Sequence, residues 1–140
     1  MYSKTVIEHF QNPHNYGKIE NPDGTGKVGN PRCGDIMYLY IKVKEDKITD
    51  IKFETLGCAA AIATSSVVTD LAKGRNIFDA LKINSENVIE KLEGLPVIKV
   101  HCSLLAADAL AEAVYDYLKK SNKAVPEELE ERHRQINKES

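Results

Sequence analysis

The sequence lacks the features that mark several large classes of protein. Its 140 residues carry a formal net charge of −2, so no basic footprint for nucleic acid or an anionic membrane is present. No apolar run approaches the roughly 20 residues that span a bilayer, and the N-terminus is not followed by the apolar core of a signal peptide. We therefore expect a cytoplasmic chain that binds neither nucleic acid nor a membrane.

The motifs of several enzyme classes are also missing. The sequence has no phosphate-cradling glycine loop of the Walker type, no Gly-x-Ser-x-Gly motif and no pair of catalytic carboxylates. It shows no internal repeat and no sign of a second domain. A hydrophobic fraction of 42% over this length is sufficient for one buried core. We expect a single domain over residues 1–140, with residues 121–140 as a charged tail.

Cysteine is scarce, since the chain has only Cys33, Cys58 and Cys102. An odd number of cysteines in a reducing compartment argues against a disulfide framework and leaves metal binding, sulfur chemistry or packing. Each cysteine lies at the edge of a predicted element, beside glycine, aspartate or histidine. Cys58 and Cys102 lie near predicted helix N-termini, which favour the thiolate that binds metals and attacks sulfur. We predict that the three converge on one metal or sulfur site.

Apolar residues at helical spacing predict several helices. Their ranges are 4–11 after the N-cap candidate Ser3, a helix from Cys58 to a cap at Gly74, 77–81, 85–92 with Ser85 as candidate cap, and about 103–120. The last helix carries a stripe that should face the core, formed by Leu104, Ala107, Ala111, Val114 and Leu118. Beyond Pro126 charge dominates, with Glu128/Arg132 and Glu130/Arg134 at i,i+4 spacing, which predicts a solvated helix or a frayed end.

Alternating apolar and polar residues predict two strands, at residues 37–43 and 49–55, joined by a short hairpin loop. The apolar sets of both strands share a face only if paired positions add to an even number, and a sum of 92 also sets Lys42 opposite Asp50. Residues 13–34 contain five of the eight glycines and three of the five prolines. That composition predicts a long loop with at most a short strand near residues 27–29.

The hairpin register has a consequence for the cysteines. Continued beyond the strands, it sets Asp35 opposite Gly57 and Cys33 opposite the residue after Cys58. Directly opposed residues have Cβ atoms roughly 5 Å apart. The hairpin alone is therefore expected to bring Cys33, Asp35 and Cys58 to one end of the sheet, within reach of a shared metal.

Two further residues are candidates for the site. His101 precedes Cys102 and could act as a ligand, a proton carrier or a capping hydrogen bonder. Asp35 offers a carboxylate, a harder ligand than thiolate, which would hold a soft metal or an iron–sulfur centre less firmly and suits a centre that leaves. The remaining histidines are assigned to the surface or to packing, without chemistry: His9, His14 and His133.

Three segments closely resemble the signature segments of the IscU/NifU-type iron–sulfur cluster assembly scaffolds. They are residues 30–35 (Asn-Pro-Arg-Cys-Gly-Asp), 57–66 (beginning Gly-Cys-Ala) and 99–106 (Lys-Val-His-Cys-Ser-Leu-Leu-Ala). Residues 2–17 are similar to that family as well, and the resemblance covers about 120 residues. It implies an α+β fold, a small and mostly antiparallel sheet of about three strands with helices packed on one face.

The resemblance also implies a function. Such a scaffold is not an enzyme; it receives persulfide sulfur from an IscS-type cysteine desulfurase, binds iron, builds a labile 2Fe–2S cluster and passes it to apo iron–sulfur proteins. The cluster ligands would be Cys33, Cys58 and Cys102, with Asp35 or His101 completing the set. Cys102 is the first candidate for the persulfide acceptor, and Cys58 the second.

The resemblance also admits a ferredoxin as electron donor, a frataxin-like partner and a homodimer bridged by the cluster. Members served by an Hsp70-type chaperone carry Leu-Pro-Pro-Val-Lys before the His-Cys pair, and the second proline is missing from residues 95–99 here, which puts that partner in doubt. The alternative is a zinc-dependent sulfur acceptor or sulfurtransferase of the SufU type, because zinc accepts the same four ligands. The chain lacks the insertion that marks that type and keeps His101. A third reading, a structural zinc domain, predicts unfolding on chelation.

Overall fold

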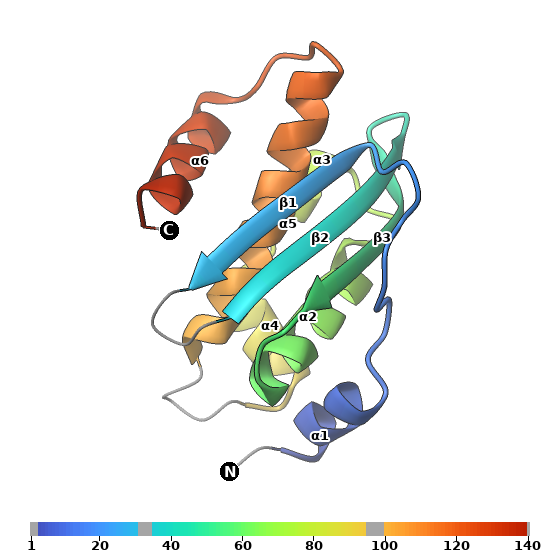
Figure 1. Cartoon of the computed structure of the whole chain (residues 1–140), viewed down its shortest axis with the longest axis vertical. Coiled ribbons are helices and arrows are strands. Elements are labelled where there is room, and N and C mark those ends of the chain that lie inside the picture. Colours follow the sequence, from blue (N-terminus) through green and yellow to red (C-terminus); the bar gives the residue numbers. More distant parts are fainter. Residues whose placement is uncertain (1–2, 31–34, 95–99, 140) are drawn as a thin grey trace.

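The computed structural model describes residues 3–30, 35–94 and 100–139. Its elements are α1 (Lys4–Gln11), β1 (Gly24–Asn30), β2 (Asp35–Lys44), β3 (Lys47–Thr55), α2 (Ala59–Ala72), α3 (Ile77–Ala80), α4 (Ser85–Lys91), α5 (Val100–Lys120) and α6 (Glu127–Glu139). The strands form one antiparallel sheet in the order β1-β2-β3. Helices α5 and α2 pack against this sheet, and α6 lies beside α5 (Figure 1). The predicted α+β fold with a three-stranded antiparallel sheet is confirmed.

The predicted hairpin register holds through most of the β2–β3 ladder. Leu39 lies opposite Phe53 and Lys42 opposite Asp50, as the sum of 92 requires. A bulge after Lys42 then shifts the register by one residue. The apolar side chains of this register are fully buried on the helix-covered face: Met37, Leu39, Ile41, Ile51 and Phe53.

Strand β1 is a correction to the predicted loop. The structure has a seven-residue strand there, although its sequence is rich in glycine. The glycines serve close packing, because a Cβ at Gly26 would lie 2.0 Å from the carbonyl oxygen of Ala109, and one at Gly24 would lie 2.2 Å from that of Ala113. Glycine therefore allows β1 to lie directly on the backbone of α5.

Helix α5 begins at Val100, one turn earlier than predicted. His101 and Cys102 therefore belong to its first turn instead of preceding it. Leu104 is half exposed, so its assignment to the core stripe is wrong, while the other four residues of that stripe are buried. The buried face is broader than a stripe, because α5 contacts β1, β2, α2, α4 and α6. It also includes Leu105, Ala106, Ala109, Leu110 and Ala113.

The helix caps follow the sequence with one exception. The Ser3 side chain accepts from the N–H of Val6 at 3.2 Å and caps α1 as predicted. Gly74 adopts a φ of +85° just beyond α2, as expected after a helix end. The N-cap of α4 is Asn84 and not Ser85. Asn84 and Asn87 exchange side-chain-to-backbone hydrogen bonds as a reciprocal capping box, which a serine one position later does not form.

The charged tail is a helix packed on α5, and not a solvated or frayed end. Leu129 is buried, and His133 stacks on Tyr115 of α5 with ring centroids 3.8 Å apart. In the described part of the chain the ion pairs of α6 join partners other than those at the predicted i,i+4 spacing. These pairs are Arg132–Asp108, Lys119–Glu130 and Arg134–Glu131, with His133–Glu112 as a fourth when the imidazole is protonated. Within residues 3–30, 35–94 and 100–139, no helix has the length and apolar character needed to cross a bilayer.

Candidate functional site

The elements that flank the three cysteines meet at one end of the sheet. β1 ends and β2 begins there, and β3, which runs antiparallel to β2, ends there too (Figure 1). The first residues of α2 and the first turn of α5 lie at the same end. The contact between β1 and α5 explains the placement of α5. Gly24 packs at Ala113 and Gly26 at Ala109, so the strand and the helix run in opposite directions and the end of β1 comes level with the start of α5.

Cys58 is the predicted site residue whose side chain the structure describes. It is the N-cap residue of α2, in an extended conformation, and its carbonyl oxygen accepts from the N–H of Ile62 at 3.1 Å. The side chain is half-buried and packs against the edge of the core. The first backbone amides of a helix lack partners within that helix, so they point toward the end at which Cys58 lies. The prediction that Cys58 lies at a helix start is confirmed.

A buried threonine fixes the turn that leads into Cys58. The hydroxyl of Thr55 donates to the carbonyl oxygen of Ile36 at 2.8 Å and accepts from the N–H of Gly57 at 3.0 Å. The first bond ties the end of β3 to the start of β2, and the second holds the turn. Leu56 between them is 89% exposed, so the chain leaves the sheet here. The β2–β3 ladder runs as far as Met37 opposite Thr55, and the N–H of Leu56 still donates to the carbonyl oxygen of Ile36 at 3.4 Å, in the predicted register. On its other side β2 pairs Asp35 with Asn30 of β1.

The other predicted ligands are described less fully. Cys33 lies outside the described residues. For Asp35, His101 and Cys102 the structure gives the backbone alone: Asp35 opens β2, and the other two are in the first turn of α5. The backbone of four of the five predicted ligands, counting Cys58, therefore lies at one end of the sheet. The ligand set itself remains a prediction.

A cluster of His9, His14 and Asp70, side chains of the types that can bind a metal ion, was not predicted. His14 Nδ1 lies 2.6 Å from Asp70 Oδ2, and the rings of His9 and His14 have centroids 4.7 Å apart. Burial is the main cause that lowers the pKa of His9 below its ordinary 6.5, and neighbouring His14 lowers it further, while Asp70 opposes both. His14 is exposed, as predicted for the surface. No sequence signal joins these residues, because Asp70 is 56 positions from His14.

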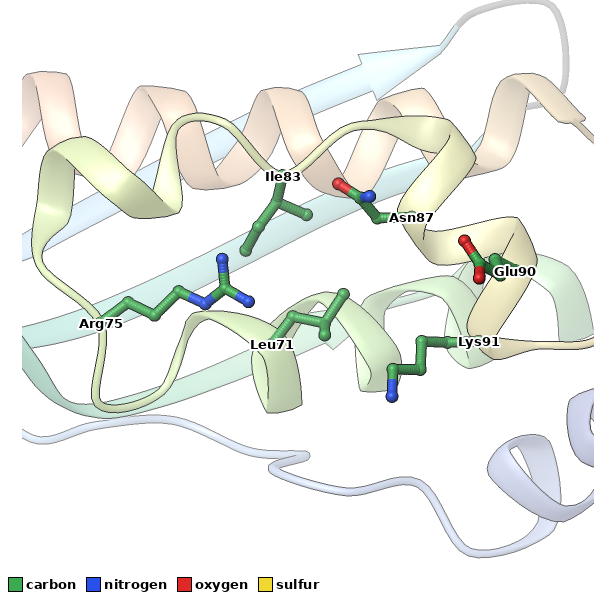
Figure 2. Close-up of a pocket in the computed structure, with 6 residues that line it drawn as sticks. All are labelled: Leu71, Arg75, Ile83, Asn87, Glu90 and Lys91. Carbon is green, nitrogen blue, oxygen red and sulfur yellow. The ribbon is translucent and has the colours of Figure 1, made fainter.

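A surface pocket of about 470 Å³ lies elsewhere, between the end of α2 and α4 (Figure 2). Its lining residues are Leu71, Arg75, Ile83, Asn87, Glu90 and Lys91. The charges are mixed, and this lining includes no thiol or imidazole. Among the described residues, none of the predicted cluster ligands lines it.

Comparison with known proteins places the chain in a family. The family model described as the NifU-like N terminal domain matches residues 1–124. The chain belongs to this family.

Curated relatives carry related names. The chain is 62% identical over 123 residues to "Iron-sulfur cluster assembly scaffold protein IscU 1" of Archaeoglobus fulgidus, covering 88% of this chain and 80% of the relative. It is 46% identical over 129 residues to "Iron-sulfur cluster assembly enzyme IscU" of Drosophila melanogaster, covering 89% and 83%. The fold is similar to the crystal structure of a "Putative iron-sulfur cluster assembly scaffold protein for SUF system" from Fervidobacterium islandicum. The TM-score is 0.69 and the sequence identity is 28%; the match covers 81% of this chain and 96% of that one.

Proposed function

We propose that this protein is a non-catalytic scaffold on which a labile 2Fe–2S cluster is assembled and from which it is passed to apo iron–sulfur proteins. One observation carries the proposal: Cys58 caps α2 at the sheet end where β2 and α5 also begin. The names of the curated relatives support it. The proposed ligands are Cys33, Cys58 and Cys102, with Asp35 or His101 as the fourth.

The first step is sulfur transfer from an IscS-type cysteine desulfurase. The Cys102 thiolate attacks the outer sulfur of the persulfide on the donor; a new S–S bond forms, the donor S–S bond breaks, and the donor cysteine leaves as a thiolate. Cys58 is the second candidate for this acceptor role. Cys102 lies in the first turn of α5, and a helix N-terminus favours the thiolate that must attack.

Cluster formation then requires an electron donor. Each transferred sulfur is formally zero-valent and takes two electrons to become sulfide. Oxidation of two ferrous ions to ferric ions supplies two of the four electrons that two sulfurs need, so a reductant must supply the other two. We propose a ferredoxin-like protein as this reductant. A frataxin-like partner and a homodimer bridged by the cluster are further proposed elements of the assembly.

We also propose a cytoplasmic location, because cysteine thiols stay reduced in a reducing compartment.

The domain organisation is part of the proposal. We propose one scaffold domain in which α6 is an addition beyond the residues 1–124 that the family model matches. Helix α6 packs on α5, with Leu129 buried and His133 stacked on Tyr115 of α5. We infer that its role is to brace α5. The contacts of α6 run along α5 from Asp108 to Lys119. Through them α6 would hold the start of α5, which lies at the sheet end near Cys58, here called the cysteine end.

The visible absorption spectrum tests the proposal. The full chain is incubated anaerobically with ferrous iron, cysteine, a cysteine desulfurase and a reductant. We expect a charge-transfer spectrum of the 2Fe–2S type that disappears when any one of the three cysteines is changed to serine. Lys82→Gln, whose side chain is 81% exposed and lies outside α5 and α6, is the control and should keep it. A colourless protein that stimulates desulfurase turnover only when zinc is bound would overturn the scaffold and favour the SufU-type sulfur acceptor.

A further inference from the structure

The cluster of His9, His14 and Asp70 joins two parts of the chain that are far apart in sequence. His9 lies in the last turn of α1, His14 in the segment that follows, and Asp70 near the end of α2. One ring nitrogen of each histidine and one carboxylate oxygen of Asp70 lie within 4.8 Å of one another. We propose that these three side chains form a second metal site, which binds a divalent first-row transition-metal ion through two imidazoles and one carboxylate.

Neighbouring polar groups hold the side chains of His9 and Asp70 and the backbone of His14, as the groups around built metal sites do. The buried hydroxyl of Ser66 accepts from the backbone N–H of His14 at 2.9 Å and lies 2.7 Å from His9 Nδ1. When this hydroxyl also accepts from Nδ1–H of His9, the free lone pair of that ring is on Nε2. Asn15 donates to Asp70 Oδ1 at 3.1 Å, which leaves Oδ2 as the oxygen that faces His14.

The donor set determines the class of ion. Two imidazoles and one carboxylate suit ferrous iron, cobalt or zinc, and leave coordination positions open for water. Two ligand atoms on one such ion are normally about 3 Å apart, given bonds of about 2.0–2.1 Å. The present 2.6 Å between His14 Nδ1 and Asp70 Oδ2 is the length of a hydrogen bond. The ion would therefore replace the shared proton and widen this contact by a few tenths of an ångström, which two exposed side chains on the surface permit.

The site is separate from the cysteine end. Asp70 follows Cys58 by twelve residues along the chain, and α2 rises by about 1.5 Å per residue, so the two lie roughly 18 Å apart. A single ion cannot contact both. The second site also lacks sulfur ligands, so its occupancy is independent of the proposed cluster assembly.

Cobalt titration of the full chain distinguishes the two sites. Co²⁺ is added anaerobically to the reduced protein, and absorption reports thiolate charge-transfer bands for ions at the cysteines and d–d bands alone for an ion with nitrogen and oxygen ligands. We expect one equivalent of the second kind, in the wild type and in a variant with all three cysteines changed to serine. With Zn²⁺, the ring nitrogens of His9 and His14 should shift in nitrogen-15 NMR spectra, while those of His133 should not.

Variants of the proposed ligands distinguish a metal site from a hydrogen-bonded contact that only joins the N-terminal segment to α2. His14→Gln and Asp70→Asn, made in the wild-type background so that the cysteines stay intact, should each weaken Co²⁺ binding at this site at least about tenfold and leave the thiolate bands unchanged. His133→Gln is the matched control, because His133 also lies 2.6 Å from a carboxylate, that of Glu112, and it should have no effect. Unchanged Co²⁺ affinity in correctly folded His14→Gln and Asp70→Asn proteins, checked by circular dichroism, would overturn the proposal.

Discussion

The cysteine end and the histidine cluster are both built around α2, but in opposite ways. The cysteine end is assembled where elements begin and end, from turns held by Thr55 and from the N-terminus of the helix. The histidine cluster is assembled along the side of α2, where Ser66 and Asp70 contact residues of the N-terminal segment. The first site depends on how the sheet ends, and the second on how α1 docks. Changes to one should therefore leave the other intact.

The largest effect is expected from the cysteines themselves. Cys102→Ser should abolish sulfur uptake from a cysteine desulfurase, because serine offers no thiolate to attack the persulfide. Cys33→Ser should largely spare uptake, although it should prevent stable cluster binding. Persulfide labelling of each variant measures this. The reverse pattern would assign the acceptor role to Cys33 and remove the advantage that we ascribe to the helix N-terminus.

The next effect concerns the packing that sets the cysteine end. Gly26→Ala should cost about 3 kcal/mol of unfolding free energy or more, since the new Cβ would meet the carbonyl oxygen of Ala109 and force β1 away from α5. Urea unfolding measures the loss. Gly74→Ala is the control: it has open space around it but a φ of +85°, so it should cost only about 1–2 kcal/mol.

The same variant tests whether the two regions are independent. In folded Gly26→Ala protein the NMR signals around β1 and the first turn of α5 should move, while those of His9 and His14 should not. Equal disturbance of both regions would show that α2 couples them and would break the contrast drawn above.

A smaller effect is expected at Asp35. Asp35→Ala should lengthen the lifetime of the assembled cluster severalfold and slow its transfer to an acceptor, because a hard carboxylate is a weak partner for an iron–sulfur centre. Cluster decay and transfer can be followed by visible absorption. Asp70→Asn is a suitable control at the histidine cluster and should change neither rate. A cluster of equal or shorter lifetime in Asp35→Ala would count against a labile fourth ligand.

The smallest effect is a titration. Because burial favours the neutral imidazole, the pKa of His9 lies below 6.5, so the stability that this group contributes is present above that pH and is lost as the pH falls toward the folded-state pKa. Nitrogen-15 NMR titration should show Asp70→Asn lowering the pKa of His9 further and His14→Gln raising it. A His9 pKa at or above 6.5 in the wild type would mean that Asp70 outweighs burial.

Local signals in the sequence predicted much of the fold. Period-two alternation identified β2 and β3, and pairing apolar sets fixed the register of Leu39 with Phe53. Turn residues and caps identified the ends of α1 and α2. These features depend on neighbours in the chain, which is why single residues such as Ser3 and Gly74 were sufficient to locate them. The same local reasoning failed at Asn84, where the capping partner had to be chosen between two adjacent residues.

The sequence by itself determined that Cys58 precedes a helix, and it predicted element edges for all three cysteines. Only the tertiary structure decided that the glycines of β1 pack against α5. A glycine-rich composition fits both a loop and a strand packed closely on a helix, so the sequence alone does not distinguish them. Tertiary structure likewise turned the charged tail into a docked helix through Leu129 and brought Asp70 to His14. Contacts between residues so far apart depend on how whole helices dock, and no local pattern encodes that geometry.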